Sequence, residues 1–379
     1  MKKKGQTSVI ANLVCTLRNT DCITTEIMEG FCGRLCFVWM VLCFGPAACA
    51  KVTCRSESGA SVDWFILYKL PKINKSSGLN YLYMDASTNG WLNGKFNIND
   101  TQSAVGQTLE PYFTYIERKT EVFGFLFYND QPPTKSKSLP PSSFGHSKGM
   151  ILLDKTTGIW LSHSTPQFPG GSRAAFWPKN GVDFGQTFLC VTYPYNSFKD
   201  IAIQLQYIHP FTFNYDLPKT FPLDLRCVAQ RECYPKTAPW SRQLKMTSVG
   251  GNTFVSFVKY SRFKDDLYSG LLVEPLGDDL FAKGWGRLHS PLPSNCSVKH
   301  NVYNIISVNL PKVPSFKTTF DHSKWCVTKG ASGRDAWTCI ADLNREKGQM
   351  LRGGGAVCTS DPAVWKAFRK MVGEFEKCT

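Results

Sequence analysis

The most informative chemical feature of this sequence is a pair of short motifs in which a histidine precedes a lysine by two positions. The motifs are the His-Ser-Lys words at residues 146–148 and 322–324. In a β-strand, residues i and i+2 point to the same face, so the imidazole and the ammonium of one motif can contact a single phosphate. The lysine can hold a phosphate oxygen, and the histidine can attack phosphorus or transfer a proton. The pattern therefore indicates phosphoryl-transfer chemistry.

A single motif of this kind would occur by chance in many proteins, where its histidine would be structural and its lysine a surface charge. Here both copies share the central serine, and an aromatic residue lies two positions before each histidine (Phe144 and Phe320). Nearly half of the chain separates the two copies. We therefore expect a duplicated half-site, with a catalytic set that consists of His146, Lys148, His322 and Lys324.

The charge of the chain favours a polyanionic partner. The full sequence has a net charge of +15, and removing residues 1–50, with their five basic and three acidic residues, leaves +13. A surplus of this size suits nucleic acid, although a dispersed, solvated basic surface is the alternative interpretation.

The first 50 residues resemble a secretory leader. The segment from Leu35 to Phe44 is apolar, follows Arg34 and leads to Ala48-Cys49-Ala50, an A-x-A cleavage pattern. We expect a signal peptide region at residues 1–50 with cleavage near Ala50 and Lys51, and with either Met1 or Met28 as the start. No later apolar run approaches the ~18 residues of a membrane span, so we expect no stable membrane association.

Glycosylation motifs and cysteines agree with secretion. Sequons begin at Asn74, Asn99 and Asn295, and nine cysteines follow residue 50. In an oxidising compartment most cysteines form disulfides, and an odd number leaves at least one thiol outside them. No C-x2-C pair or histidine cluster occurs after residue 50, which argues against a zinc site. We expect neither a metal nor a cofactor.

Apolar runs bounded by proline, glycine and polar residues predict a mixed fold of the α/β or α+β class. A short helix is expected at 265–274, with Leu267, Leu271 and Leu272 inward and Pro275 as its stop, and a second helix follows the cap at Asp361. A segment rich in proline and aromatic residues, 206–240, joins the halves. Strands are expected at 62–71, 122–130, 158–164, 252–261, 302–311 and 336–344.

Many local sequences resemble the deoxyribonuclease II family, which is related to the phospholipase D superfamily. The resemblance covers about residues 52–378 and rests on VDWFILYKLP, AVGQTL, FYNDQPP, GHSKG, WLSHSTPQFP, DDLYSG, LPSNCS, DHSKWC, WTCIADLNR and RGGG. It implies two phospholipase D-like halves, residues 51–205 and 241–379, packed as a pseudo-twofold repeat around one cleft. It further implies a metal-independent acid endonuclease that cleaves double-stranded DNA with little sequence preference, leaves 3′-phosphate ends and works in the lysosome or partly outside the cell. The oligomeric state stays open.

The resemblance also implies disulfides. It pairs Cys54 with Cys190, Cys296 with Cys378 and Cys339 with Cys358. Cys227 and Cys233 are a fourth candidate pair, an addition of this chain. Cys326 would then be the odd thiol, which we expect to be buried rather than nucleophilic.

The chain departs from the superfamily in its carboxylates. The superfamily carries an aspartate five residues after the motif lysine, whereas Leu153 and Lys329 occupy those positions here, and Asp154 comes one residue late. The partner of each histidine is therefore missing or supplied from elsewhere. His163, Asp342 and Asn344 are candidate supporting residues, with a purely structural role as the alternative. The loops 134–138 and 345–355 are candidate contacts for the DNA backbone.

Two other functions use some of these features. A phospholipase-type phosphodiesterase would need the same motifs but also an apolar surface for acyl chains. A non-catalytic glycoprotein that binds nucleic acid would need the charge but not two intact motifs. For the nuclease, we expect the lysines to lower the pKa of one motif histidine while bound phosphate keeps the other charged, without assigning which histidine attacks.

Overall fold

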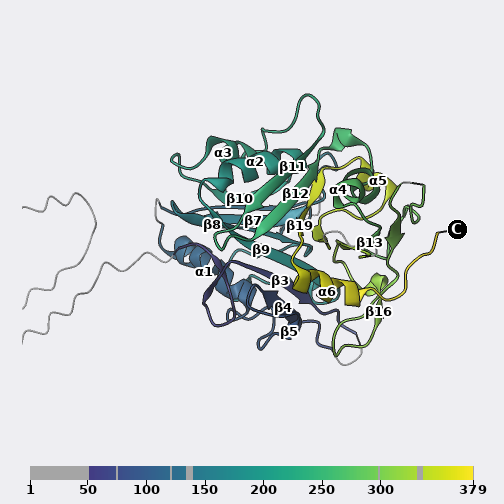
Figure 1. The fold of residues 1–379 in the computed structure, drawn as a ribbon. Helices are drawn as coiled ribbons and strands as arrows, with labels where there is room; N and C mark the ends of the chain where they lie inside the picture. The colour runs from purple at the N-terminus through teal and green to yellow at the C-terminus, as the bar shows by residue number, and fades with distance from the viewer. Residues whose placement is uncertain are drawn as a thin grey trace, which may run out of the picture. The chain divides into compact units, whose positions relative to one another are not determined.

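Continuous apolar runs form the central strands, and these strands are buried on both faces. Every residue is buried in β3 (Trp64–Lys69), β6 (Gly124–Asn129) and β7 (Lys148–Leu153). Such strands must lie inside a sheet that is covered on both sides. The computed structural model describes residues 51–73, 76–119, 122–133, 140–297, 299–330 and 336–378, and it shows how this cover is built (Figure 1).

The first sheet has eight strands, and all of its neighbouring pairs are antiparallel. The hairpin of β7 and β8 pairs Gly149 with Ser162, so the first His-x-Lys motif lies where β7 begins, near the middle of the sheet. In spatial order the strands are β10 (Thr212–Asp216), β6, β7, β8 (Thr157–His163), β9 (Gln186–Pro194), β3, β4 (Tyr81–Asp85) and β5 (Leu92–Asn93).

The second sheet has seven strands, of which only the neighbours β13 and β14 run parallel. The second motif directly precedes β17, which lies between β18 and β13. In spatial order the strands are β11 (Ser241–Thr247), β12 (Thr253–Lys259), β19 (Gly354–Thr359), β18 (Thr338–Ala341), β17 (Trp325–Thr328), β13 (Leu280–Lys283) and β14 (Val302–Asn304). Two small sheets pair β1 (Cys54–Arg55) with β2 (Ser61–Val62), and β15 (Ser307–Val308) with β16 (Phe316–Lys317).

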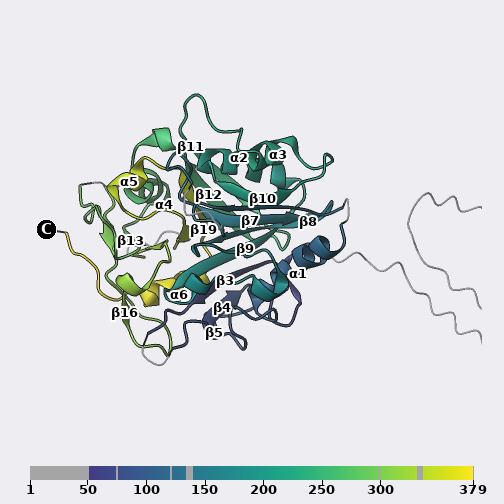
Figure 2. The same cartoon turned by 180° about the vertical axis from the view of Figure 1, so that it is seen from behind.

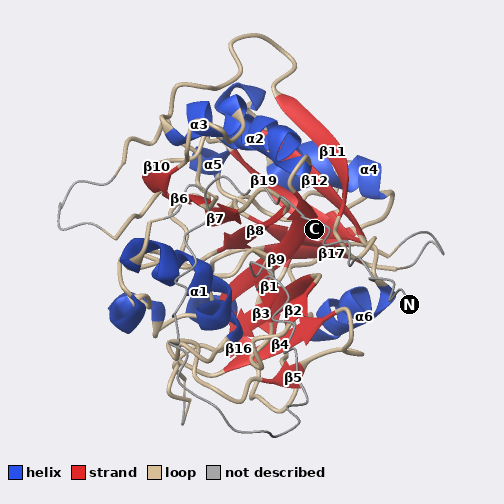
Figure 3. Ribbon diagram, turned by 90° about the vertical axis from the view of Figure 1, so that its left-hand side faces the viewer, coloured by secondary structure: helices blue, strands red, loops and turns tan. Residues whose placement is uncertain are grey.

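Helices cover the sheets. Helix α2 packs beside α3 and contacts strands of both sheets, namely β9 in the first and β11, β12 and β19 in the second. Figures 1 and 2 show α2 and α3 together from opposite sides, and Figure 3 shows them above the red strands. The helices are α1 (Ala104–Glu117), α2 (Ser197–Ile208), α3 (Leu223–Ala229), α4 (Val273–Leu276), α5 (Lys347–Met350) and α6 (Pro362–Met371).

One apolar core is common to both sheets. It contains Ile151 and Trp160 from the first sheet, Val258 and Trp325 from the second, and buried faces of α2, α3 and α6. A second core lies between the first sheet and α1, and a third covers the second sheet beneath α4. Both sheets are therefore buried on both faces, and the described residues belong to one compact unit.

The mixed fold class and most expected strands are confirmed. Five of the six expected runs contain a strand with shifted ends, whereas 302–311 is divided into β14 and β15. Helix α6 begins as expected, because a carboxylate oxygen of Asp361 accepts hydrogen bonds from the N–H groups of Ala363 at 2.8 Å and Val364 at 3.0 Å.

The expected helix at 265–274 differs from the structure. A π-helical turn at Tyr268–Leu272 leads into α4, and Pro275 lies inside α4 rather than ending the helix. The helix ends at Gly277, whose φ of +70° places it in the left-handed region that glycine adopts without strain. Leu267 and Leu272 are buried as expected, and Leu271 is half-buried.

Helices α1 and α2 were not predicted. Ser103 caps α1 through its side-chain oxygen, which accepts a hydrogen bond from the N–H of Gly106 at 3.0 Å. Pro111 inside α1 hides the helical pattern in the sequence. Helix α2 continues to Ile208 and β10 joins the first sheet, so the expected connection at 206–240 contains the end of α2 and the whole of β10 and α3. In the part of the chain that the structure describes, no helix is long and apolar enough to cross a membrane.

Candidate active site

The first motif is held by an acidic residue on the neighbouring strand. Because β6 pairs Asn129 with Lys148, the next residue, Asp130, lies beside the motif. The Asp130 carboxylate forms an ion pair with Nζ of Lys148 and lies 3.3 Å from Nδ1 of His146. Nη1 of Arg352, which precedes β19, lies 3.1 Å from the same carboxylate. Asp130 thus supplies the carboxylate that positions 153 and 154 do not.

The second motif has different partners. Nδ1 of His322 lies 2.8 Å from the main-chain oxygen of Ser164, and because a carbonyl only accepts, Nδ1 carries the proton. Nζ of Lys324 donates to the main-chain oxygen of His322 at 2.6 Å and lies 3.2 Å from Nε2. The Trp285 ring meets the imidazole edge to face, with 4.8 Å between the ring centroids. His322 is therefore oriented by a carbonyl and an indole, whereas His146 faces a carboxylate.

Both histidines line one pocket of about 550 Å³, together with Asp130, Trp285 and Arg352. The first sheet provides His146 and Asp130, and the second provides His322, so residues far apart in sequence meet at one place. Two imidazoles and an arginine on the wall of one pocket, with Nζ of Lys324 3.2 Å from Nε2 of His322, suit an anion with a tetrahedral centre, such as a phosphodiester.

The charges of this site are strongly coupled. Burial lowers the pKa of His146 to about 4, although Asp130 acts in the opposite direction. Burial, together with the positive charges of Lys324 and Lys148, holds the pKa of His322 well below its ordinary value. Burial alone would raise the pKa of Asp130, but His146, Lys148 and Arg352 outweigh it and hold that pKa well below its usual range. The groups of the site thus lower the pKa of both motif histidines. That bound phosphate keeps one of them charged stays a prediction.

The three candidate supporting residues occupy different places. His163 is buried between Phe168 and Phe188, and its Nδ1 accepts a hydrogen bond from the N–H of Thr165 at 3.1 Å. Burial and Lys148 hold its pKa well below the ordinary value. Its aromatic packing is that of a structural histidine.

Asn344 reaches the pocket, but Asp342 does not. Oδ1 of Asn344 accepts a hydrogen bond from the N–H of Trp285 at 2.9 Å, so Asn344 holds the residue that packs against His322. Oδ2 of Asp342 accepts a hydrogen bond from the N–H of Gly355 at 3.0 Å, and burial raises its pKa to about 7. Among the described residues, no hydrogen bond joins Asp342 to either motif histidine.

Sequence reasoning missed Asp130 and named Arg352 only as part of a loop. Asp130 lies in the FYNDQPP segment, but its contact with the motif depends on the pairing of β6 with β7, which the sequence does not show. Asp154 instead closes a turn, where its Oδ1 accepts a hydrogen bond from the N–H of Thr157 at 2.9 Å. The candidate loop at 134–138 lies outside the described residues.

Within residues 51–378, as far as the structure describes them, four disulfides join the pairs that were expected: Cys54–Cys190, Cys227–Cys233, Cys296–Cys378 and Cys339–Cys358. Among the described residues, Cys326 is the free cysteine. It is fully buried in β17, and burial raises the pKa of its thiol, which disfavours the nucleophilic thiolate.

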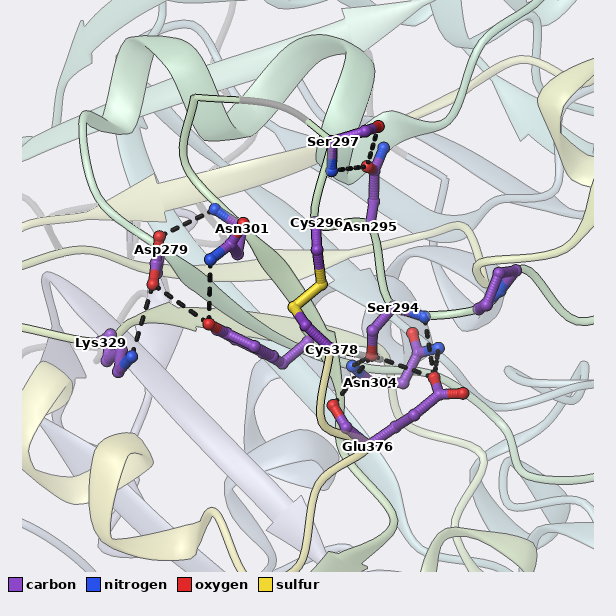
Figure 4. Close-up of a disulfide and its surroundings, with 12 residues drawn as sticks. Asp279, Ser294, Asn295, Cys296, Ser297, Asn301, Asn304, Lys329, Glu376 and Cys378 are labelled. Carbon is purple, nitrogen blue, oxygen red and sulfur yellow. Dashed lines mark hydrogen bonds and ion pairs between the residues drawn. A yellow bond between two sulfur atoms is a disulfide. The ribbon is translucent and has the colours of Figure 1, made fainter.

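The sequons lie in different surroundings. Asn99 is exposed, and Asn74 lies outside the described residues. Asn295 lies next to the Cys296–Cys378 disulfide, as Figure 4 shows, and its Oδ1 accepts a hydrogen bond from the Ser297 hydroxyl at 2.8 Å. Within the described ranges, no group of three or more His, Cys, Asp or Glu side chains is placed to hold a metal ion.

Comparison with known proteins agrees with this chemistry. The sequence profile of the family described as Deoxyribonuclease II matches residues 53–378. Deoxyribonuclease-2-alpha of Rattus norvegicus is 40% identical over 338 residues, which cover 86% of this chain and 95% of the relative. Deoxyribonuclease-2-beta of Homo sapiens is 36% identical over 343 residues, which cover 88% of this chain and 94% of the relative. Plancitoxin-1 of Acanthaster planci is 37% identical over 337 residues, which cover 86% and 93%.

Proposed function

Because the chain belongs to the deoxyribonuclease II family and is a nuclease of that type, we propose that it is an acid endonuclease that hydrolyses double-stranded DNA with little sequence preference. The observation that carries this proposal is the single pocket lined by His146 and His322. In the expected chemistry, one imidazole attacks phosphorus and the other serves the leaving oxygen, so both must reach the same phosphate.

The different partners of the two histidines suggest their roles. Nδ1 of His146 is turned toward Asp130 and shielded from solvent, which leaves Nε2 for phosphorus. Attack by Nε2 forms a phospho-imidazolium, whose positive charge the Asp130 carboxylate stabilises. We therefore assign His146 as the nucleophile and His322 as the general acid. The negative charge of a bound phosphodiester would raise the pKa of His322, so that His322 is protonated and can act as the general acid.

Two displacements complete the reaction. In the first, the bond from Nε2 of His146 to phosphorus forms, the bond from phosphorus to O5′ breaks, and His322 gives its proton to O5′. In the second displacement, His322 takes a proton from water, the resulting hydroxide attacks phosphorus, and the bond from phosphorus to Nε2 of His146 breaks. The products are a 5′-hydroxyl and a 3′-phosphate.

Cations of the chain can stabilise this reaction without a metal. Lys148, Lys324 and Arg352 surround the two imidazoles and can neutralise the non-bridging oxygens as charge develops. We propose on this basis that the enzyme is metal-independent and needs no cofactor.

The strand orders support a repeated architecture. In the first sheet, β6-β7-β8-β9-β3 are neighbours, and in the second sheet, β13-β17-β18-β19-β12 are neighbours in the same order and all antiparallel. Each motif lies directly at the second strand of its series. We propose a pseudo-twofold repeat of two phospholipase D-like halves, 51–205 and 241–379, joined by 206–240.

The disulfides and the leader-like segment support a proposal about location. Four disulfides need an oxidising compartment during folding, and the leader-like segment at residues 1–50 would provide entry. We propose passage through the secretory pathway, glycosylation at Asn74, Asn99 and Asn295, and a site of action in the lysosome or partly outside the cell.

Plasmid cleavage with EDTA at pH 5 tests the function. The purified protein should nick supercoiled DNA, and the ends should accept phosphate at the 5′ position from a kinase without prior phosphatase treatment. Phospholipid vesicles assayed in parallel test the phosphodiesterase alternative. Loss of nicking on chelation with recovery on adding Mg²⁺, or lipid cleavage without DNA cleavage, would contradict the proposal.

Reactions quenched in alkaline denaturant test the intermediate, because the phosphorus–nitrogen bond of a phosphohistidine survives base but hydrolyses in acid. Mass spectrometry should locate the 3′-phosphorylated DNA fragment on His146. Phosphate on His322 would reverse the assigned roles, and phosphate on a serine or on Cys326 would overturn the mechanism.

A further inference from the structure

Each motif histidine is held by a loop from the opposite sheet. The N–H of His322 donates to the main-chain oxygen of Gly185 at 2.8 Å, and the N–H of His146 donates to that of Gly353 at 2.9 Å. Gly185 ends the loop before β9, in the first sheet, and Gly353 ends the loop before β19, in the second. We call residues 182–185 the first strap and residues 349–353 the second strap.

The straps are closely packed at their glycines. A Cβ atom at Gly185 would lie 2.5 Å from Oδ1 of Asp321, and one at Gly353 would lie 2.2 Å from the main-chain oxygen of Ile208. These distances leave no room for a larger residue. A displacement of either strap is therefore passed directly to the histidine that it holds.

A buried lysine ends the strand beside each strap. Nζ of Lys69, at the end of β3, donates to the main-chain oxygen of Val182 at 2.8 Å. Nζ of Lys259, at the end of β12, donates to the main-chain oxygens of Met350 at 2.9 Å and Arg352 at 2.7 Å. Both side chains are fully buried.

The two lysines occupy matching places in the two sheets. Lys69 pairs with Gln186, the first residue after the first strap, and Lys259 pairs with Gly354, the first residue after the second strap. Each lysine therefore acts on the loop of its own sheet, and that loop holds the histidine of the other sheet.

Neither lysine is explained by packing alone. Burial lowers the pKa of Lys69 to about 7, against the opposing effect of Asp321 and Asp183. Burial lowers the pKa of Lys259 to about 8, although the negative charges of Asp266 and Asp265 act in the opposite direction. A buried ammonium whose hydrogen-bond acceptors are neutral carbonyls is costly, and an apolar side chain of similar length would avoid this cost.

We propose that Lys69 and Lys259 are positioning residues that act across the two sheets, Lys69 on His322 through the first strap and Lys259 on His146 through the second. The inference rests on the proposed catalytic role of the two histidines. An in-line attack on phosphorus depends on the placement of both imidazoles, and a shift of about 1 Å can cost on the order of 100-fold in rate.

The test uses the full chain with 15N-labelled histidine. Lys69→Met and Lys259→Met are compared with wild type by the ring signals of the six histidines, assigned by single replacements. We expect Lys69→Met to shift the ring signals of His322 and to leave the ring signals of His146 unchanged. Lys259→Met should shift the ring signals of His146 and leave those of His322 unchanged. A merely structural role would disturb the motif on the lysine's own sheet, or both motifs equally.

Kinetics provide the second readout. Each variant should lose about 10- to 100-fold in kcat. KM should stay within about threefold for Lys69→Met, because the first strap lies outside the candidate DNA-contacting loops, whereas KM is free to change in Lys259→Met, because the second strap carries Arg352 of the pocket. Lys69→Arg and Lys259→Arg, which keep the charge and the donors, should recover part of the kcat. Lys155→Met is the matched control, since Nζ of Lys155 also donates to a distant main-chain oxygen, that of Thr220 at 2.8 Å, but at the surface.

Each outcome decides the question. The crossed pattern of shifts can be read from any folded variant of each lysine, whether methionine, glutamine or arginine. Shifts confined to the histidine of the same sheet, unchanged kcat, or equal effects in Lys155→Met would overturn the inference. Failure of the nuclease proposal is separate, because it would appear as full activity after replacement of His146 or His322 and would leave the ring signals readable.

Discussion

Oδ2 of Asp130 lies 3.3 Å from Nδ1 of His146, and the same carboxylate also faces Lys148 and Arg352. One buried carboxylate is thus shared by three positively chargeable groups of the site. It balances their charge, and under the proposed mechanism it faces Nδ1 of His146 and leaves Nε2 for the reaction.

Replacing Asp130 with asparagine should preserve the shape of the site and remove its negative charge. We expect kcat to fall by about 100-fold, because the phospho-imidazolium would lose its counter-charge. Lys148 and Arg352 would also lose the carboxylate that pairs with them. Plasmid nicking with a parallel thermal melt separates the catalytic loss from instability. Asp154→Asn is the control, because Asp154 contacts the turn before β8 and the N–H of Val52 but does not line the pocket. Equal kcat in both variants would contradict the assigned role.

Replacing either motif histidine should nearly abolish cleavage. His146→Ala and His322→Ala each remove one of two groups that act on the same phosphate, so each should lose at least about 1000-fold, or about 4 kcal/mol of transition-state stabilisation. His300→Ala, outside the pocket, should remain active. Near-normal activity of one motif variant would mean that the two motifs do not share a site.

The rate should have an acidic maximum. The attacking imidazole must be neutral. Because burial lowers the pKa of His146 to about 4, this imidazole is still neutral at pH 5, and its neutral form is lost only as the pH falls through about 4. The acid partner must be protonated in the complex with DNA, so the rate should fall again as pH rises. Profiles of kcat/KM and kcat from pH 3 to pH 8 check this. A rate that still increases through pH 8 would exclude the assigned roles.

The pH profile also tests Asp130 directly. This carboxylate raises the pKa of His146, so Asp130→Asn should move the acidic limb of kcat/KM to lower pH. An unmoved or upward-shifted limb would show that another group controls it.

DNA affinity should depend steeply on salt. A net charge of +13 after residue 50 favours contacts with phosphates, which release counterions on binding. Fluorescence anisotropy of His322→Ala with random duplexes at 50–300 mM NaCl should give a linear fall of log affinity with log salt and similar affinities for all sequences. Salt-independent binding, or strong discrimination among duplexes, would argue against recognition through the backbone.

The start of α6 makes a separate prediction about stability. Asp361→Ala removes the acceptor of two helix N–H groups and should lower the free energy of unfolding by about 1 kcal/mol, whereas Asp361→Asn should change it by only a few tenths. Guanidinium unfolding of the three proteins gives these differences. Equal losses in both variants would point to charge rather than capping.

Local features of the sequence predicted local features of the structure. The cap at Asp361 and the strands expected at 158–164 and 336–344 depend on neighbouring residues, and all are present. Asp130 could not be assigned in this way, because its proximity to His146 results from the pairing of β6 with β7. The straps depend on contacts over still longer distances, between Gly185 and His322 and between Gly353 and His146.

The hydrogen bond from His146 to Gly353 has a consequence for biosynthesis. Residue 353 lies far downstream of residue 146, so the ribosome makes the histidine long before the glycine that holds it. A nascent or truncated chain that lacks the second strap cannot orient its first histidine, even if the first sheet has already formed. Under the proposed mechanism, a growing chain therefore cleaves no nucleic acid until residue 353 has been made.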